Sequence, residues 1–237
     1  MRSIMSGEPK KVYTVTAVRE EAPGVRTLEL AVEDSTSFHA GQFITVYFPE
    51  LNVPEGKAYS LSAAPFEQRL TITVKAMGEF SNRLCNIHIG NSFLGSEPYG
   101  FFYSEERETP LVLLAIGIGV TPFRSLILET LQGEPDRKLL LCYGSRTCAD
   151  IIFRETWEST AKMHTSFRVV HFLSREEAEG MERGRMSAER ILPLIEDVSN
   201  AEFMLCGSIA FVRDLWKGLC SAGVGEERIY TEAFFTN

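Results

Sequence analysis

The sequence of 237 residues predicts two domains of different classes: an N-terminal antiparallel β-barrel and a C-terminal α/β domain with a doubly wound parallel sheet. Short β-rich runs separated by turn residues fill the first hundred residues. The rest of the chain alternates apolar runs with helical segments. The charged stretch SEERETP at 104–110 lies between the two patterns. We therefore place the barrel at residues 1–106 and the α/β domain at residues 107–237.

Five β-rich runs predict the strands of the barrel, and no long helical pattern interrupts them. We expect one helix in this half, covering NRLCNI, with Ser81 as its N-cap because a serine hydroxyl can accept a hydrogen bond from a free N–H of the first turn. Gly78, just upstream, allows the backbone to turn. The strand runs are VYTVTAV (12–18), RTLELAV (26–32), QFITVYF (42–48), AYSLSA (58–63) and RLTITVKAM (69–77).

Five further apolar runs predict parallel strands, because runs without alternation are typical of strands that are buried on both faces. They are LVLLAIG (111–117), KLLLCYG (138–144), FRVVHFL (167–173), AEFMLCG (201–207) and RIYTEAF (228–234). Two amphipathic helices are predicted between them, at 121–131 and from 208 to a stop at Gly223. Their apolar faces comprise Phe123, Leu126, Ile127 and Leu131, and Ile209, Val212, Leu215, Trp216 and Leu219.

Composition and charge argue against several classes of function. The formal net charge is -8 and the basic residues are scattered, which argues against a nucleic-acid partner. We expect a cytoplasmic protein without a membrane span, because the N-terminus has no secretory pattern and no apolar run approaches about 20 residues. The five cysteines, at 85, 142, 148, 206 and 220, lack the spacing of zinc or iron–sulfur ligands, and the four histidines stand alone. No metal site is predicted.

Three predicted strand ends in the α/β half carry candidate binding residues, because ligands of open α/β sheets bind beyond the carboxyl ends of the strands. At 117–122 (GIGVTP), glycines would let a polyanion approach the backbone, Thr121 can cap the next helix, and Pro122 suits its first turn. Ser145 and Arg146 offer a hydroxyl and a guanidinium at the second strand end, and a thiol precedes another capped helix at 206–208 (CGS). Taken alone, each segment is more typical of a structural turn than of a binding site, and it is the three strand ends together on one predicted edge that favour binding.

The order of the motifs resembles that of the ferredoxin:NADP oxidoreductase superfamily over nearly the whole chain. The Arg-x-Tyr-Ser motif of that family resembles Lys57-Ala58-Tyr59-Ser60, and its Gly-x-x-Ser motif matches Gly78-Glu79-Phe80-Ser81. The Gly-x-Gly-x-Thr-Pro motif stands unaltered at 117–122, the Cys-Gly element is similar at 206–216, and the closing Glu-x-Phe element is similar at 232–235. The resemblance implies a flavin-binding barrel followed by a nicotinamide-nucleotide domain, with no iron–sulfur domain.

The resemblance also implies roles for individual residues. Tyr59 would lie against the isoalloxazine ring, the Ser60 hydroxyl would lie near flavin N5, and Ser81 with its helix start would hold the flavin pyrophosphate. Thr121 and Cys206 would border the nicotinamide. The implied catalytic residues are Ser60, Cys206 and Glu232. The implied contacts to FAD and to NADP or NAD are Lys57, Ala58, Tyr59, Ser60, Val74, Lys75, Gly78, Phe80, Ser81, Asn82, Gly117, Gly119, Thr121, Pro122, Ser145, Arg146, Cys206, Gly207, Phe234 and Phe235.

Lys57 departs from the family motif, because lysine lacks the planar fork with which arginine grips a phosphate. The tightness of flavin binding, and the choice between FAD and FMN, therefore stay open. One interpretation is an NAD(P)H-dependent flavoprotein reductase that passes electrons to a separate ferredoxin, haem protein or oxygenase component. A second is a flavin reductase that releases reduced flavin, and a third is a non-catalytic binding module with the same fold. Ser145 and Arg146 favour NADPH over NADH.

Overall fold

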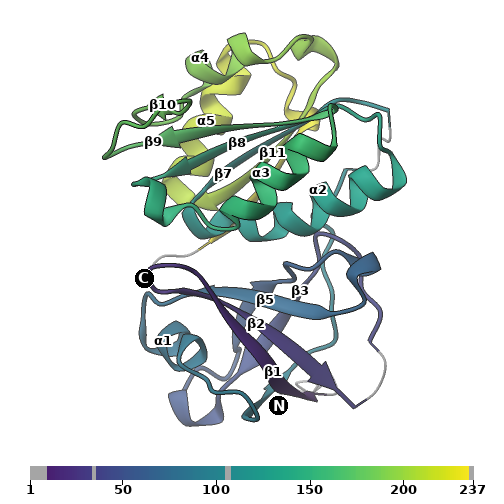
Figure 1. Cartoon of the computed structure of the whole chain (residues 1–237), viewed down its shortest axis with the longest axis vertical. Helices are drawn as coiled ribbons and strands as arrows, with labels where there is room; N and C mark the ends of the chain where they lie inside the picture. Colours follow the sequence, from purple (N-terminus) through teal and green to yellow (C-terminus); the bar gives the residue numbers. More distant parts are fainter. Residues whose placement is uncertain (1–9, 34–35, 105–107, 235–237) are drawn as a thin grey trace, which may run out of the picture.

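The computed structural model describes residues 10–33, 36–104 and 108–234. These residues form one antiparallel and one parallel sheet, each of six strands. Figure 1 shows one domain above the other, with helices α2 (Thr121–Gly133) and α3 (Arg154–Met163) on the side of the parallel sheet that faces the barrel. The predicted fold class is confirmed. The predicted boundary between residues 106 and 107 lies outside the described residues.

The antiparallel sheet closes into a barrel. Its strand order is β4-β3-β6-β1-β2-β5. The Ser62 N–H donates to the carbonyl oxygen of Thr71 at 2.9 Å, and Leu61 pairs with Ile72, so the segment after β4 joins β5. The four-residue strand β6 was not predicted, whereas the equally short β4 was, because the alternating run AYSLSA continues past the end of β4 to residue 63 and β6 has no such extension. The strands are β1 (Lys11–Ala22), β2 (Val25–Val32), β3 (Phe43–Tyr47), β4 (Lys57–Ser60), β5 (Leu70–Lys75) and β6 (Ser92–Gly95).

The helix of the barrel begins three residues earlier than predicted. Helix α1 spans Glu79–Cys85 and its N-cap is Gly78, so the prediction that Ser81 is the N-cap was wrong. The Ser81 hydroxyl lies in the first turn and accepts hydrogen bonds of 3.0 Å from the N–H groups of Met77 and Gly78. A serine at the N-cap and a serine in the first turn can both bond to nearby backbone groups. The sequence alone therefore does not distinguish these two positions.

The second sheet is entirely parallel, in the order β10-β9-β8-β7-β11-β12. Strands β7, β8 and β9 follow one another in one direction, whereas β11 and β12 lie on the other side of β7. The order therefore reverses between β7 and β11. All five predicted strands are confirmed, and the two-residue β10 was not predicted. The strands are β7 (Leu111–Ile116), β8 (Leu139–Ser145), β9 (Phe167–Leu173), β10 (Glu182–Arg183), β11 (Glu202–Ser208) and β12 (Ile229–Phe234).

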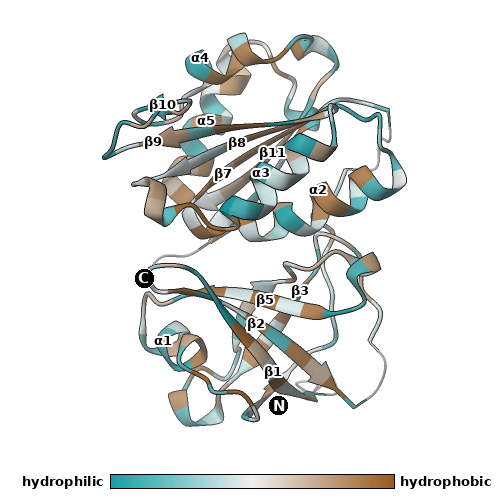
Figure 2. Ribbon diagram, in the orientation of Figure 1, coloured by the Kyte–Doolittle hydropathy of each residue, from teal (hydrophilic) through white to brown (hydrophobic). Residues whose placement is uncertain are grey.

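Helices cover both faces of the parallel sheet, which encloses its apolar strands (Figure 2). Helices α4 (Ala188–Ile191) and α5 (Ile209–Ser221) lie on the face away from the barrel. The predicted apolar face of α2 is buried at all four positions, whereas on α5 the first predicted residue, Ile209, is 47% exposed. Ile209 begins the helix, before the turn that packs against the sheet. None of the described helices is long and apolar enough to cross a membrane.

Candidate functional site

The carboxyl ends of β7, β8 and β11 open into a cleft of about 950 Å³. Its walls include the three strand ends, the loop that follows β10, and the turn between β1 and β2 of the barrel. The cleft lies where the strand order reverses, which is the usual position of a ligand in an open α/β sheet, and its volume suits a large cofactor. Because both domains line it, a ligand bound here would also face the barrel.

The predicted nucleotide residues divide between the surface of this cleft and the layer behind it. Gly119, Thr121, Pro122 and Cys206 are buried and do not line the cleft. Phe235 lies outside the described residues. The predicted residues that line the cleft are Lys75, Gly117, Ser145, Arg146, Gly207 and Phe234. Three strand ends that are separate in the sequence thus meet at one site.

The two glycines of the Gly-x-Gly motif have different roles. Gly117 has a positive φ of 51°, and a Cβ there would meet no atom within 4 Å, so this position is open toward the cleft. A Cβ on Gly119 would lie 2.3 Å from the carbonyl oxygen of Cys206. Gly119 therefore allows the turn after β7 to pack against β11. The expectation that the glycines admit a polyanion fits Gly117 and is wrong for Gly119, because strand β11 fills that space.

Thr121 does not cap helix α2 as predicted. The N-cap is Val120, and the Thr121 hydroxyl donates to the carbonyl oxygen of Ile118 at 2.9 Å. That bond tightens the 3₁₀ turn Gly117–Val120, which continues directly into the helix, whereas Pro122 lies in the first turn as predicted. By contrast, the predicted cap of α5 is confirmed, since the Ser208 hydroxyl accepts a hydrogen bond from the N–H of Phe211 at 3.3 Å.

Tyr143 supports the open glycine from behind, a role that the sequence did not reveal. Its hydroxyl donates to the carbonyl oxygen of Gly117 at 3.0 Å and accepts from the N–H of Ile152 at 3.3 Å. The ring is completely buried, and this burial raises the pKa of the hydroxyl well above its usual range. Tyr143 is therefore a neutral donor that fixes the turn at the cleft.

The second strand end presents unpaired polar groups to the cleft. The Ser145 hydroxyl is buried and has no hydrogen-bond partner among the described residues, which costs about 1–3 kcal/mol. Arg146 and Arg185 also line the cleft, and neither guanidinium has an ion-pair partner in the described ranges. The carboxylate of Asp150 instead binds Thr147, since one of its oxygens accepts hydrogen bonds from the N–H and the hydroxyl of that residue at 3.0 and 2.7 Å. Arg185 was missed, since nothing in its sequence context marks it.

Cys206 and Glu232 stand opposite each other on the neighbouring strands β11 and β12. Burial raises the pKa of the Cys206 thiol well above its ordinary value, and the nearby carboxyl raises it further. Burial also raises the pKa of Glu232 to about 7, and one of its oxygens has no hydrogen-bond partner among the described residues. The thiol is therefore neutral rather than nucleophilic at neutral pH. The carboxyl of Glu232 can gain or lose a proton near neutral pH.

The second group of predicted residues lies on the barrel, where β4 meets α1. The rings of Tyr59 and Phe80 stack with centroids 6.4 Å apart, and the ammonium of Lys57 lies 5.8 Å from the centroid of the Phe80 ring. Ser60 is buried at the end of β4. The structure thus brings together the two flavin-like motifs, 57–60 and 78–81, although about 20 residues separate them.

Other predicted flavin contacts are more restricted. The side chain of Val74 is fully buried in the barrel core, which leaves only its backbone available to a ligand. Asn82 is exposed, and its amide donates to the carbonyl oxygen of Gly78 at 3.0 Å. Ala58 and Lys57 are exposed at the start of β4. No group of three or more histidine, cysteine, aspartate or glutamate side chains within the described part of the chain is arranged to hold a metal ion.

A closed antiparallel barrel beside a doubly wound sheet, with a cleft at the reversal of the strand order, defines a two-domain nucleotide-binding protein. Residues 113–217 match the family model of the oxidoreductase NAD-binding domain. The structure of the flavohem-like FAD/NAD binding domain of nitric oxide dioxygenase from Vibrio cholerae has a TM-score of 0.84 at 28% identity, covering 94% of this chain and 98% of that one.

Two curated relatives agree with this class. The ferredoxin reductase component of 3-ketosteroid-9-alpha-monooxygenase from Mycolicibacterium smegmatis is 31% identical, over 93% of this chain and 64% of the relative. A flavohemoprotein from Vibrio cholerae is 32% identical, over 94% of this chain and 59% of the relative. This chain thus spans less than two thirds of the length of either relative. The family model, these relatives and the solved structure confirm the predicted resemblance to the ferredoxin reductase-like superfamily of FAD- and NAD-binding oxidoreductases.

Proposed function

We propose that this protein is an NAD(P)H-dependent flavoprotein reductase that passes electrons to a separate acceptor. The observation that carries the proposal is the cleft at the reversal of the strand order, which is lined by both domains. A dinucleotide along the strand ends would extend toward the barrel that carries the flavin-like motifs. The named relatives, a ferredoxin reductase component and a flavohemoprotein, support the same reaction class.

The barrel residues fit FAD by their chemistry. Tyr59 offers a flat apolar ring, Ser60 a hydroxyl at the end of β4, and Lys57 an exposed cation for a phosphate. Gly78 leaves the backbone before α1 open, because a Cβ there would meet no atom within 4 Å. When bound, the flavin would supply the redox chemistry, accepting a hydride and passing electrons on. The role of these residues is to bind and orient it.

The cleft residues fit a nicotinamide dinucleotide. The orphaned hydroxyl of Ser145 would gain a partner, the open backbone at Gly117 would admit a phosphate, and Arg146 would neutralise negative charge. Cys206 and Glu232 stand behind the strand ends, where a neutral thiol would shape the nicotinamide site and Glu232 would hold or release a proton. We assign Ser60, Cys206 and Glu232 to the catalytic site on this basis.

The acceptor that we propose is a ferredoxin, a haem protein or an oxygenase component, since the relatives include parts of a monooxygenase system and a flavohemoprotein. One observation favours a second function, a flavin reductase that releases its product. Lys57 is exposed and supplies a single ammonium in place of a guanidinium fork, so the grip on the flavin phosphates would be weaker.

The test is purification by gel filtration, an absorbance spectrum, and anaerobic titration with NADPH and with NADH. A yellow protein that either coenzyme bleaches supports the flavoprotein reductase. A colourless protein that oxidises NAD(P)H only when flavin is added supports the flavin reductase instead. Failure to oxidise either coenzyme in the presence of added FAD or FMN refutes both enzyme functions and leaves the binding module.

A further inference from the structure

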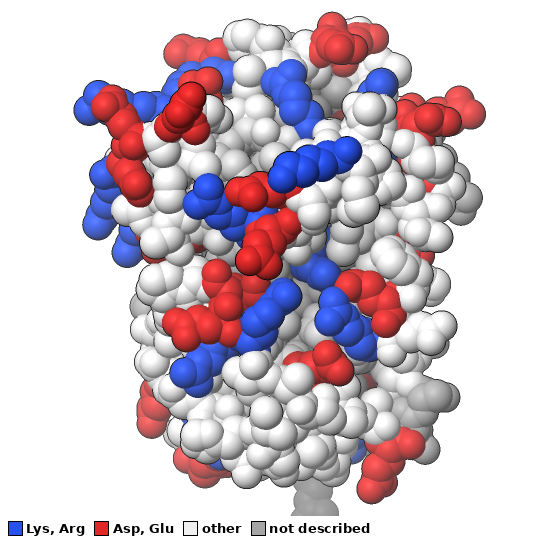
Figure 3. Space-filling view, viewed as in Figure 1, with Lys and Arg blue, Asp and Glu red and all other residues white. Residues whose placement is uncertain are grey.

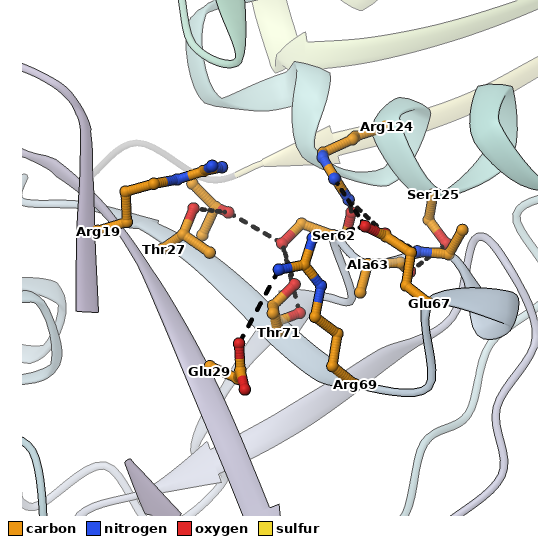
Figure 4. A network of polar contacts seen from close by, with 12 residues as sticks. Arg19, Thr27, Glu29, Ser62, Ala63, Glu67, Arg69, Thr71, Arg124 and Ser125 are labelled. Atoms are coloured by element: carbon orange, nitrogen blue, oxygen red, sulfur yellow. Dashed lines mark hydrogen bonds and ion pairs between the residues drawn. The ribbon is translucent and has the colours of Figure 1, made fainter. Parts of the chain in front are cut away.

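A buried polar junction joins helix α2 to the barrel (Figure 4). The guanidinium of Arg124 on α2 donates to the carbonyl oxygen of Ser62 at 2.7 Å and to the two carboxylate oxygens of Glu67 at 2.7 and 3.0 Å. Next to it, the Ser125 hydroxyl donates to the carbonyl oxygen of Ala63 at 2.7 Å. Arg124 is only 7% exposed and Ser125 is completely buried. Figure 3 shows acidic and basic side chains gathered across the middle of this face of the molecule, where the two domains meet.

Both ends of this junction lie within a few residues of a proposed cofactor site. Arg124 and Ser125 follow Thr121 by one helical turn, and Thr121 closes the turn that begins with Gly117 at the cleft. On the barrel, the bonded carbonyls lie two and three residues after Ser60. The rest of the described contact includes apolar packing, such as the stacked rings of Phe102 and Phe123 at 5.8 Å. Apolar contact is non-directional, whereas the hydrogen bonds of Arg124 and Ser125 fix the position of α2 relative to the barrel segment after Ser60.

Neighbouring groups hold the two charged partners in place. Glu67 also accepts from the N–H of Ala64 at 2.8 Å and from Arg69 at 2.5 Å. Burial alone would raise the pKa of Glu67, but the hydrogen bonds from Arg124 and Ala64 outweigh it and lower the pKa to about 2, so the carboxylate is charged at neutral pH. The guanidinium of Arg124 lies 5.6 Å from the centroid of the Phe153 ring.

Phe153 has an uncommon backbone conformation for a bulky residue, with φ at 58°. Such a conformation costs free energy and persists only where the surroundings enforce it. Phe153 is the N-cap residue of α3, and its ring packs against Trp157 of that helix with centroids 6.0 Å apart. The ring of this N-cap residue therefore lies close to both the guanidinium of Arg124 and the buried Trp157 of α3.

We propose that Arg124 and Ser125 are positioning residues for hydride transfer, holding the barrel segment after Ser60 in register with the turn that binds the nicotinamide nucleotide. The inference rests on the proposed function. Neither residue lines the cleft, so their loss should leave coenzyme affinity nearly unchanged. Hydride transfer needs its donor and acceptor atoms in contact, and a displacement of about 1 Å can cost about a hundredfold in rate. The junction lies between the proposed flavin site and the proposed nicotinamide site, so it can control the distance between the hydride donor and acceptor atoms.

The experiment compares Arg124→Lys with the parent in anaerobic stopped-flow reduction of the flavin by NADPH and by NADH. Lysine keeps the positive charge but cannot bind two carboxylate oxygens and a carbonyl in one plane. We expect the limiting reduction rate to fall about tenfold or more, whereas the coenzyme Kd and the flavin content change by less than about twofold. The charge-transfer absorbance between reduced flavin and oxidised nicotinamide should also weaken, because it depends on ring stacking.

Arg137→Lys is the matched control. Arg137 is equally buried and binds the carbonyl of Thr109 and the carboxylates of Glu134 and Glu202. It also donates to the hydroxyl of Ser104 at 3.1 Å, in the segment that leads into the α/β domain, and none of its partners lies near the proposed flavin residues 57–60 and 78–81. We expect this variant to lose stability without a change in the limiting rate or in the charge-transfer band. A purely structural role for Arg124 would make the two variants behave alike.

Three outcomes separate the two proposals. If the coenzymes reduce the parent flavin and Arg124→Lys has the parent's limiting rate and charge-transfer band, the positioning role is refuted and the proposed function stands. If the parent flavin is not reduced at all, the proposed function fails and the inference fails with it. If Arg124→Lys does not fold, Ser125→Ala decides, since it removes one hydrogen bond to the barrel: an unchanged limiting rate refutes positioning, and a rate about threefold lower with an unchanged Kd supports it.

Discussion

Substituting Glu232 by glutamine tests the unusual carboxyl behind the cleft. Burial raises the pKa of this group from 4.5 to about 7, so between these values the folded state holds a proton that the unfolded state has lost. The contribution of the Glu232 carboxyl to the free energy of unfolding is therefore fully present below pH 4.5 and is lost as the pH rises through 7. A shift of this size corresponds to about 3 kcal/mol, which partial exposure reduces to about 2–3 kcal/mol.

Glutamine is neutral at every pH, so Glu232→Gln avoids the cost of ionisation. We expect the free energy of unfolding to exceed that of the parent by about 2–3 kcal/mol at pH 8, and the difference to vanish near pH 4.5. The assay is urea unfolding of the flavin-free protein at both pH values. Tryptophan fluorescence suits it, because Trp157 and Trp216 both lie in the α/β domain, which contains Glu232.

The control for this experiment is Glu55→Gln, which changes an exposed carboxylate of the barrel and should have little effect at either pH. An equal effect of Glu232→Gln at pH 8 and pH 4.5 would refute the reasoning, because a change that does not depend on pH cannot come from ionisation. A variant less stable than the parent at pH 8 would show that the carboxylate is paired in the folded protein.

Four other substitutions test the site. Lys57→Ala should weaken flavin binding by about 1–3 kcal/mol in a fluorescence titration, and parent-like affinity would show that Lys57 does not contact the phosphates. Cys206→Ser should slow flavin reduction while the flavin spectrum stays nearly unchanged; a covalent adduct at Cys206 in intact-mass spectra during turnover would contradict its assignment as a neutral thiol. Arg146→Ala should lower kcat/KM for NADPH about tenfold or more and leave kcat/KM for NADH nearly unchanged. Equal losses for both coenzymes would place Arg146 on the shared part of the dinucleotide. A parent enzyme faster with NADH would overturn the preference for NADPH. Gly119→Ala should lower the free energy of unfolding in urea by about 1–3 kcal/mol, because its Cβ would lie 2.3 Å from the carbonyl oxygen of Cys206. The control is Gly133→Ala, whose Cβ would have no atom within 4 Å. Equal stability of the two variants would contradict the close packing at Gly119.

The strands of the parallel sheet could be predicted from the sequence because burial on both faces leaves an uninterrupted apolar run. The barrel strands longer than four residues and the buried face of α2 also follow from local periodicity. Strands β6 and β10 are too short to show a period, and on α3 only Trp157 and Thr160 are buried, so its pattern is weak. Local signals therefore predict the elements that have enough buried residues to repeat.

The motifs at 57–60, 78–81 and 117–122 indicated the family that the chain resembles, and the segments 117–122, 143–147 and 206–208 predicted which strand ends form the cleft. The particular role of each residue was decided by tertiary contacts. Gly119 is needed because β11 packs against the turn after β7, and the pKa of Glu232 depends on its burial opposite Cys206. Arg124 binds Glu67, although 57 residues separate them in the chain. Such contacts join segments that are distant in the sequence, and no local pattern of residues indicates which segments will meet. These contacts are therefore decided by the tertiary structure alone.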